Sequence, residues 1–537
     1  MKKKIAKYGA FVLLGLVFLA LVLLNLFWQD HWLDSDMAAE MIFSKLLSES
    51  GHIFATPEWY YSTEFRFLYT HLVMAPLFLA SENWHLIRLI TNVLSYALML
   101  VAYFYMMKPL KADRRLTALT AILLLLPFSE TMMTHMQMGN TYMPHVIICF
   151  FFLGMYLRLV RKEVYTKAGR WTLFCFFVIL SLICGVSGVR YLLALQCPLV
   201  ITAFVYVLDS TDFQLFREQF GRNENAAGYF RRVLKGEEIR YLYMALSGAV
   251  CSIVGYGINV LWVSRQYVFQ TYGATNFIAV YQGVLWERLQ NAIGSLLMLF
   301  GYIPDKGFLS LRGFISILAF VMLWIFGYCV IKARKKSTGQ RLFMVLFVIT
   351  AFVLNLFVFV FTTSTMVPRY YITVFIFALP ALVFYMEQEE PVLDRFAVGM
   401  LLAFCLTLAS AKITLSFIST DKNEGKRAVA AFLQENGYEF GYAGYWNANI
   451  VTELTDGRVE VANIMDPETL EYFKWSSPMK YYGEGYHEGE VFLLLSAEEN
   501  EQYRDTEALK AGKQVYRDAD YVVYGYESSE ELFSKKQ

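Results

Sequence analysis

The chain has 537 residues, of which 57% are hydrophobic, 17% are aromatic and only 17% carry a formal charge. An average soluble chain carries about 25% charged residues. Here the apolar residues fall in runs of about 20, the length that crosses a hydrocarbon core about 30 Å thick. The composition therefore predicts a polytopic membrane protein and excludes soluble enzymes, disordered chains and nucleic-acid-binding proteins. Residues 1–416 hold 35 basic and 23 acidic residues, whereas residues 417–537 hold 12 basic and 23 acidic ones. We expect a basic transmembrane domain over 1–416 and an acidic soluble domain over 417–537.

Eleven apolar segments are predicted to span the membrane as helices. The first has the position of a signal peptide, but its apolar run is long and no small-residue cleavage site follows it, so we interpret it as a retained anchor. Residues 263–310 fit no complete span, and a half-embedded helix over 291–303 is the alternative there. The predicted spans cover residues 8–28, 84–107, 115–133, 141–160, 171–189, 191–208, 241–262, 311–331, 341–361, 370–386 and 394–416.

Lys and Arg are distributed unevenly between the connecting segments. With the N-terminus in the cytoplasm, the cytoplasmic segments hold 25 of them and the exterior segments hold 8. This excess is the positive-inside pattern. We predict a multi-pass protein of the cell membrane with a cytoplasmic N-terminus, and the odd number of spans places the acidic C-terminal domain outside the cytoplasm. Merging or splitting one span would reverse that last assignment.

The first exterior loop, residues 29–83, is the longest and begins with clustered carboxylates. Asp36 and Glu40 are four residues apart and share one face of a helix that we predict to run to about Ser48. Asp36 suits the N-cap of that helix, which is a structural role. A carboxylate just outside a membrane span also suits a general base that acts on a substrate hydroxyl. The spacing leaves both interpretations open.

The same loop continues with Trp59, Tyr60 and Tyr61, followed by Glu64 and Arg66. Aromatic rings with polar tips anchor proteins at the membrane interface, and on these residues alone we favour anchoring. The alternative is a substrate-binding role, in which the rings stack on sugars and the two charged residues supply hydrogen bonds.

A short polar segment, residues 136–145, lies between the third and fourth predicted spans. Its candidate cavity-lining residues are Gln137, Asn140, Tyr142 and His145. A lone histidine is more often structural, and no nucleophile pairs with it in the sequence. The chain contains no HExxH, GxSxG or P-loop pattern, which argues against a metalloprotease, a serine hydrolase and an ATP-driven pump.

Two arginines, Arg190 and Arg369, lie at the exterior ends of apolar spans. Charge at membrane depth indicates a functional residue, although a long side chain also reaches the interface by snorkelling. A planar guanidinium binds phosphate bidentately, and lipid phosphates lie at this depth. We expect Arg369, with help from Arg190, to contact a lipid phosphate.

The segment from Asp421 onward has alternating helical and strand patterns without a glycine-rich phosphate loop. It predicts a small α/β domain that is large enough to bury its own core. The predicted helices cover 426–436 and 501–511, and the predicted strands cover 440–445, 458–464, 491–495 and 521–526.

Together these features resemble the GT-C membrane glycosyltransferases, a superfamily that includes the dolichyl-phosphate-mannose protein mannosyltransferases and the bacterial aminoarabinose transferase. The acidic first-loop motif of the superfamily falls on Asp34-Ser-Asp-Met-Ala-Ala-Glu40, and its late Pro-Arg-Tyr segment falls on residues 368–370. The segment 441–450 is similar to that of uncharacterised Gram-positive members. The common Asp-Glu pair is absent, because Ser35 precedes Asp36 and Met37 follows it. The resemblance covers the whole chain and implies a GT-C fold of about eleven transmembrane helices with a small extracytoplasmic α/β domain.

The resemblance also implies a site and a reaction. Asp36 is the expected base, Asp34 its rival, and Glu40 a helper, while Arg369, Arg190 and Tyr370 hold the phosphate of a lipid donor. The implied activity is inverting transfer of a sugar from a polyprenyl-phosphate carrier to a hydroxyl of an extracytoplasmic glycan, lipid or protein. The alternatives are a polysaccharide polymerase or ligase that uses lipid-diphosphate oligosaccharides, a lipid-linked sugar flippase or transporter, and an inactive scaffold. A divalent ion on Asp34 and Asp36 is a further alternative, but two carboxylates make a weak metal site, so we expect no cofactor.

Overall fold

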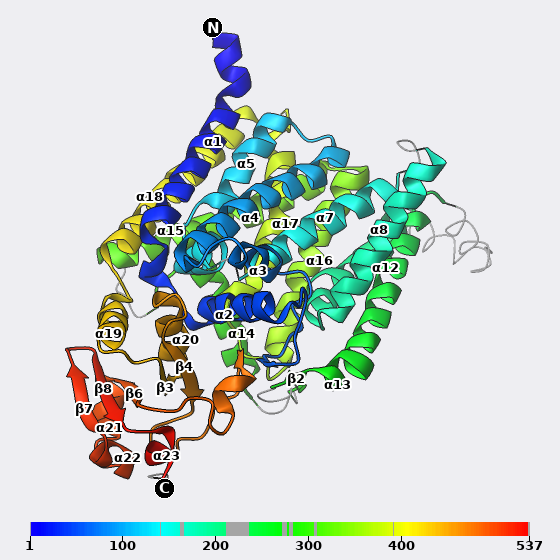
Figure 1. Cartoon of the computed structure of the whole chain (residues 1–537). Coiled ribbons are helices and arrows are strands. Elements are labelled where there is room, and N and C mark those ends of the chain that lie inside the picture. The colour runs from blue at the N-terminus through cyan, green and yellow to red at the C-terminus, as the bar shows by residue number, and fades with distance from the viewer. Residues whose placement is uncertain are drawn as a thin grey trace.

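The computed structural model describes residues 2–139, 141–161, 166–210, 236–270, 276–278, 283–304, 309–389 and 391–534. Within these ranges, nine helices are long and apolar enough to cross a membrane. The spans through α9 and α17 include the helical turn before each helix and begin at Leu192 and Pro368. The nine spans form one bundle (Figure 1) and contain α1 (Lys2–Trp28), α4 (Trp84–Met107), α8 (Lys167–Val186), α9 (Cys197–Ser210), α12 (Ile239–Ile258), α15 (Leu311–Lys336), α16 (Gly339–Phe361), α17 (Ile372–Met386) and α18 (Val392–Ser419).

Two further apolar segments complete the bundle. One is the shorter helix α7 (Met143–Leu159). The other is predicted as one straight span over 115–133, but α5 (Arg114–Leu125) ends early and a 90° bend leads into Glu130–Met138. Pro127 lies at this bend, where its ring prevents continuation of the helix. With these two segments, the expectation of about eleven membrane helices is confirmed.

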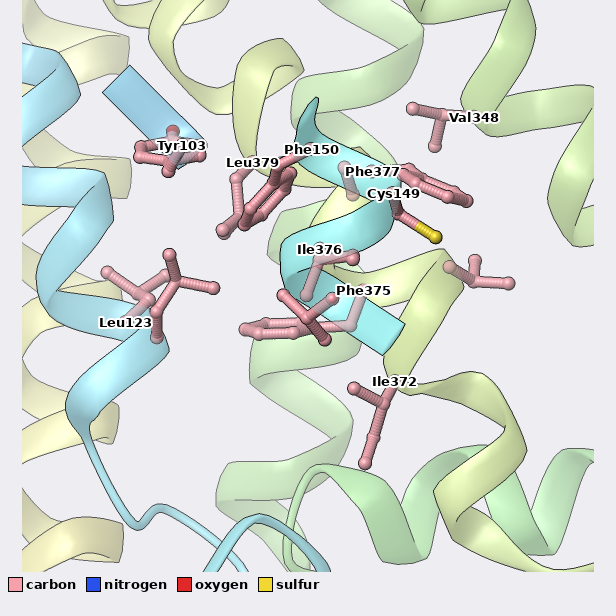
Figure 2. Packing of buried hydrophobic residues seen from close by; sticks show 14 of the residues in the cluster. Tyr103, Leu123, Cys149, Phe150, Val348, Ile372, Phe375, Ile376, Phe377 and Leu379 are labelled. Carbon is pink, nitrogen blue, oxygen red and sulfur yellow. The ribbon is translucent and has the colours of Figure 1, made fainter. Parts of the chain in front are cut away.

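The centre of the bundle is α17, in which 14 of 15 residues are buried. Its apolar side chains cover every face, as expected for a helix with no exposed side. Figure 2 shows part of this buried apolar cluster, which includes Ile376 and Phe377 of α17 as well as Cys149 and Phe150 of α7. Aromatic contacts extend the core, with ring centroids of Phe347 and Phe377 4.8 Å apart. This packing gives the residues at the start of α17 a fixed position.

The long loop between α1 and α4 contains two helices and a strand, α2 (Ser35–Ser50), β1 (Trp59–Tyr61) and α3 (His71–Phe78). The predicted helix after the clustered carboxylates is confirmed. Its N-cap, however, is Asp34, whose Oδ1 accepts a hydrogen bond from the backbone N–H of Met37 at 2.9 Å. The interpretation of Asp36 as the N-cap was therefore wrong. The carboxylate of Asp36 is available for other contacts.

The C-terminal domain, residues 421–534, contains a five-stranded sheet with the order β4-β3-β6-β8-β7. Strand β3 (Phe440–Gly444) pairs in parallel with β4 (Glu460–Ile464) and β6 (Val491–Ser496), whereas β8 (Tyr521–Tyr526) is antiparallel to β6 and to β7 (Lys513–Arg517). The helices are α19 (Glu424–Glu435), α20 (Tyr445–Leu454), α21 (Ala497–Gln502), α22 (Glu507–Ala511) and α23 (Ser529–Phe533). The single helix expected over 501–511 is wrong, since α21 and α22 are separate, with Thr506 at the N-cap position of α22.

The C-terminal domain lies at the end of the bundle opposite to the N-terminus (Figure 1). It is joined to the first loop, because β5 (Ser477–Pro478) pairs antiparallel with β1, which pairs in parallel with β2 (Val268–Phe269). Helix α20 also packs against α2. The opposite placement of the two ends agrees with an odd number of spans. The boundary at residue 416 and the assignment of sides remain predictions, and α18 ends at Ser419.

Candidate active site

A polar cavity of about 120 Å³ lies where the first loop, the bundle and the C-terminal domain meet. Helix α2 supplies Asp36 and Glu40, and the bundle supplies Arg190, Arg369 and Tyr370. The remaining lining residues are Ala39, Phe43, Phe54, Trp59, Tyr61, Ser62, Thr63, Glu64, Phe65, Arg66, Trp475 and Ser476. Three parts of the chain that are far apart in the sequence therefore form one site.

The half-buried carboxylate of Asp36 has two different partners. Its Oδ2 lies 3.8 Å from Arg369 Nη1, and Arg369 is held on the short helix η7 (Pro368–Tyr371) that leads into α17. Its Oδ1 accepts a hydrogen bond of 2.7 Å from the hydroxyl of Tyr445, the first residue of α20. Asp36 therefore faces a cation and a neutral donor from opposite parts of the molecule.

The other two cavity arginines each have a close carboxylate partner. Glu40 forms an ion pair with Arg66, and Arg190 Nε lies 2.8 Å from Glu64 Oε1. By contrast, 3.8 Å between Arg369 and Asp36 exceeds the length of a hydrogen bond. Among these three cavity arginines, Arg369 thus has the loosest ion pair, which suits it to an added anion.

Burial changes the protonation of two first-loop carboxyls. Burial and the neighbouring charge of Asp36 raise the pKa of Asp34 to about 6. Burial also raises the pKa of Glu40, although the adjacent Arg66 opposes this increase. Asp34 and Asp36 face different partners, because one caps α2 and the other lies between Arg369 and Tyr445. Among the described residues, no group of three or more His, Cys, Asp or Glu side chains is arranged to hold a metal ion.

His145 supports Arg190 from behind. Arg190 Nη1 donates to His145 Nε2 at 3.0 Å, and His145 Nδ1 lies 2.6 Å from the hydroxyl of Tyr191. Because a guanidinium has no acceptor atom, Nε2 must accept and the ring carries its proton on Nδ1. The imidazole is therefore a neutral support that orients Arg190.

An apolar groove of about 350 Å³ adjoins the polar cavity. The two share Glu64, Arg190 and Tyr370 as lining residues. The ring of Tyr370 stacks on that of Phe359 at 5.4 Å. The rest of the groove is built mainly from aliphatic side chains of residues 189–194, which precede α9, and of α16. A molecule with a charged head and a long apolar tail would fit here, with its head in the polar cavity and its tail in the apolar groove.

The structure brings most of the predicted residues together. Asp36, Glu40, Trp59, Tyr61, Glu64, Arg66, Arg190, Arg369 and Tyr370 line the polar cavity, and Tyr142 lines the apolar groove. Tyr60 packs against Tyr482 instead, and Gln137 is 1% exposed and donates to the carbonyls of Leu124 and Leu126 beside the bend after α5. Asn140 lies outside the described residues.

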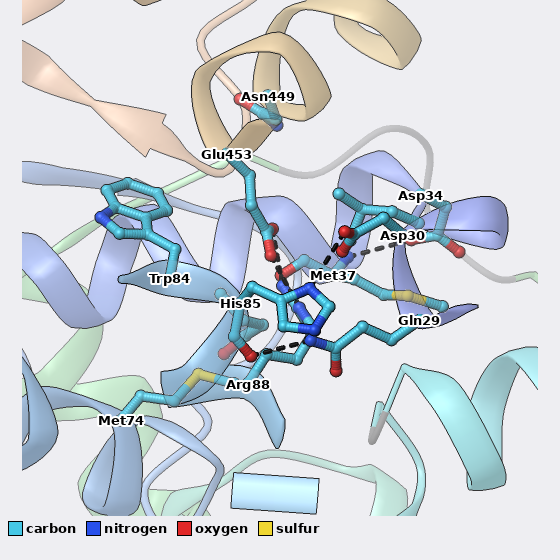
Figure 3. A network of polar contacts seen from close by, with 12 residues as sticks. Gln29, Asp30, Asp34, Met37, Met74, Trp84, His85, Arg88, Asn449 and Glu453 are labelled. Atoms are coloured by element: carbon cyan, nitrogen blue, oxygen red, sulfur yellow. Dashed lines mark hydrogen bonds and ion pairs between the residues drawn. The ribbon is translucent and has the colours of Figure 1, made fainter. Parts of the chain in front are cut away.

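The C-terminal domain contributes residues that sequence reasoning missed. Trp475 and Ser476 line the cavity, and Ser476 has a φ of +45°, a left-handed conformation that is costly for a residue with a Cβ. Glu453 of α20 binds the buried Arg88 of α4 through two hydrogen bonds of 2.7 and 2.6 Å, and Figure 3 shows the two side chains pointing toward each other. Local sequence carries no signal for these contacts, since Arg88 and Glu453 are 365 positions apart and the cavity joins Trp475 to residues of the first loop.

The long first loop and the C-terminal α/β domain are folded over one end of an apolar bundle, and this fold is similar to that of solved membrane proteins. The structure of ArnT from Cupriavidus metallidurans in the apo state is similar to this chain with a TM-score of 0.58 and 14% identity over 99% of each chain. The same protein bound to undecaprenyl phosphate gives a TM-score of 0.57 and 14% identity over 99% of each chain. An oligosaccharyltransferase from Archaeoglobus fulgidus, tethered with an acceptor peptide, gives 0.47 and 12% identity over 98% of this chain and 75% of that one. No family model and no curated protein matches the sequence. The predicted GT-C resemblance is confirmed at the level of the fold.

Proposed function

We propose that this protein is an inverting glycosyltransferase that moves a sugar from a polyprenyl-phosphate carrier to an acceptor hydroxyl on the outer face of the membrane. One observation carries the proposal: the cavity with Asp36 and Arg369 adjoins an apolar groove through three shared residues. The groove suits a polyprenyl chain and the shared rim suits its phosphate. In support, ArnT of the same fold has been solved with undecaprenyl phosphate bound.

Asp36 is the proposed base. Its Oδ2 would take the proton of the acceptor hydroxyl while the hydroxyl oxygen attacks the anomeric carbon of the donor sugar. The bond between that carbon and the phosphate oxygen breaks on the opposite face, so the configuration inverts. The bonding electrons leave with the polyprenyl phosphate, which gains one negative charge.

Arg369 and Arg190 are the proposed stabilisers of that charge. Arg369 lies 3.8 Å from the proposed base, and Arg190 lines both the cavity and the groove. Glu40 pairs with Arg66 at the side of the cavity, where the two would shape the site for the acceptor. Asp34 is the weaker candidate for the base, because its carboxylate is engaged in capping α2.

The direct test supplies the purified protein with polyprenyl-phosphate sugars and candidate acceptors and measures released polyprenyl phosphate. Asp36→Asn should abolish release while the protein still accumulates in the membrane. Glu49→Gln is the matched control, since this carboxylate lies on the same helix and pairs with Lys45 on the surface. Full activity of Asp36→Asn would exclude Asp36 as the base. Movement of the donor lipid between leaflets without release would indicate a flippase. In a parallel reaction supplied with lipid-diphosphate oligosaccharides, release of polyprenyl diphosphate would indicate a polymerase or ligase.

A further inference from the structure

The hydroxyl of Tyr445 is the C-terminal domain's direct contact with the proposed base. It lies 2.7 Å from Asp36 Oδ1, although the two residues are 409 positions apart in the sequence. Tyr445 is 8% exposed, and its ring is held edge-on against Phe473 at 5.6 Å. A hydrogen bond to an ionised carboxylate is stronger than one between neutral groups.

The backbone around Tyr445 is also fixed to α2. Ser35 Oγ donates to the carbonyl of Tyr445, so two adjacent residues of α2 contact a single residue of α20. Tyr445 follows Gly444 at the carboxyl end of β3, which pairs with neighbours on both sides. The position of the hydroxyl is therefore set by the sheet and not by a free loop.

Two further contacts keep the domain in this position. Arg88, which is 1% exposed, binds Glu453 on α20 and also donates to the carbonyl of Met37 on α2. At the other side of the cavity, β5 pairs with β1 and places Trp475 and Ser476 in the cavity wall. The domain is thus attached on both sides of Asp36.

We propose that Tyr445 is a positioning residue for Asp36: its hydroxyl holds Oδ1, so that Oδ2 is the oxygen presented to the cavity and to Arg369. This inference rests on the proposed glycosyl transfer. Burial and the charge of Asp36 raise the pKa of Tyr445, which keeps the phenol protonated and able to donate. The C-terminal domain then orients the carboxylate of Asp36 through Tyr445. Without this domain, the membrane domain would hold Asp36 but not fix the direction of its carboxylate.

The test compares Tyr445→Phe with Tyr442→Phe in the full-length protein. Tyr442 is the matched control, because its hydroxyl pairs with Ser529 inside the same domain at 3.0 Å. Tyr445→Phe should lower kcat about tenfold and change the KM values for donor and acceptor by less than about twofold. Tyr442→Phe should keep the full kcat of the wild type. A Tyr445→Phe enzyme with unchanged kcat, or equal losses in both variants, would overturn the proposal.

A second measurement does not depend on turnover. Thermal unfolding of Tyr445→Phe, Asp36→Ala and the double variant forms a double-mutant cycle, in which alanine is used because the amide oxygen of asparagine could still accept from the Tyr445 hydroxyl. If the hydrogen bond exists, Tyr445→Phe lowers the Tm of the wild type but not that of Asp36→Ala. Additive shifts would overturn the contact. Non-additive shifts in a protein that releases no polyprenyl phosphate would instead refute the proposed function and keep the contact.

Discussion

Asp34 and Asp36 are two residues apart, and their different surroundings predict opposite effects of the same substitution. The pKa of Asp34 rises from 3.8 to about 6 because the carboxyl is buried and lies near the charge of Asp36. A difference of one pH unit between the folded-state and unfolded-state pKa corresponds to about 1.4 kcal/mol. A carboxyl with a raised folded-state pKa favours folding most strongly below about pH 4 and loses that contribution as the pH rises through about 6. At pH 7 the ionised Asp34 therefore destabilises the fold by up to about 3 kcal/mol.

Asp34→Asn should remove this penalty, because the amide cannot ionise. Asn is as good an N-cap as Asp, so its side-chain oxygen can still accept from the N–H of Met37. We expect the variant to be more stable than the wild type at pH 7 to 8, with a difference that disappears near pH 4. Urea unfolding in detergent, followed by tryptophan fluorescence at each pH, measures the difference.

The matched control is Asp113→Asn, at an exposed N-cap that accepts from the N–H groups of Arg115 and Leu116. It should change the stability by less than about 0.5 kcal/mol at any pH. A loss of stability in Asp34→Asn at pH 7, or a gain of equal size at pH 4 and pH 7, would refute the reasoning. The activity of the same variant separates the rival bases: Asp34→Asn should keep the transferase activity that Asp36→Asn loses.

Three further predictions concern the phosphate site, the groove and the domain contact. Arg369→Ala should lower the rate of donor cleavage about 100-fold, and Arg369→Lys should recover part of it because it restores the charge without the bidentate fork; single-turnover release of polyprenyl phosphate measures both. Leu354→Trp, which places a large ring in the apolar groove, should raise the KM for long-chain donors and leave short-chain donors unaffected, and equal effects on both would place the lipid elsewhere. Glu453→Ala should cost about 3 to 5 kcal/mol in unfolding experiments, because it leaves Arg88 buried without its carboxylate, and adding Arg88→Met should return part of the loss; a cost below about 1 kcal/mol would mean that the pair acts like a surface pair.

The sequence predicts those parts of the fold whose signals are local. The membrane helices follow from runs of apolar residues, and α2 follows from the spacing of its side chains. The four predicted strands of the C-terminal domain are present, because each is a short apolar run between polar turns. The bend after α5 was missed even though Pro127 marks it, since hydropathy continues across the break.

Helix α20 illustrates why the rest could not be predicted. Its sequence includes Asn447 and Asn449, which have low helix propensity, and eight of its ten residues are buried. The amphipathic periodicity that marks a surface helix is therefore missing. Its helical state depends on packing against α2 and the sheet, which are distant in the sequence. The same holds for the pairing of β1 with β5, whose register joins Tyr60 to Ser477.

The candidate site could be predicted in its charged residues but not in its assembly. Charges beside a membrane are conspicuous in the sequence, and this singled out Asp36, Arg190 and Arg369. Tyr445 is one of 36 tyrosines, and only the folded chain distinguishes it from the others. Gln137 shows the opposite case, since its polarity and its position between two spans singled it out as a cavity residue. In the folded chain it donates to the backbone carbonyls beside the bend after α5, which is a structural role.

The assembly of the site from separate parts also links its chemistry to the position of the C-terminal domain. Arg369 is fixed to the bundle by η7 and the buried α17, whereas Asp36 lies on α2, which is held between the bundle and α20 by the pair of Arg88 and Glu453. A shift of the domain therefore changes the distance from Asp36, the proposed base, to Arg369, the proposed phosphate ligand. A misplacement of about 1 Å costs about 100-fold in rate. Molecules in which the C-terminal domain has moved away from α2, here called undocked, should therefore contribute almost nothing to turnover. Weakening the domain contact should then lower kcat in proportion to the docked fraction, while the molecules that remain docked react at the full rate.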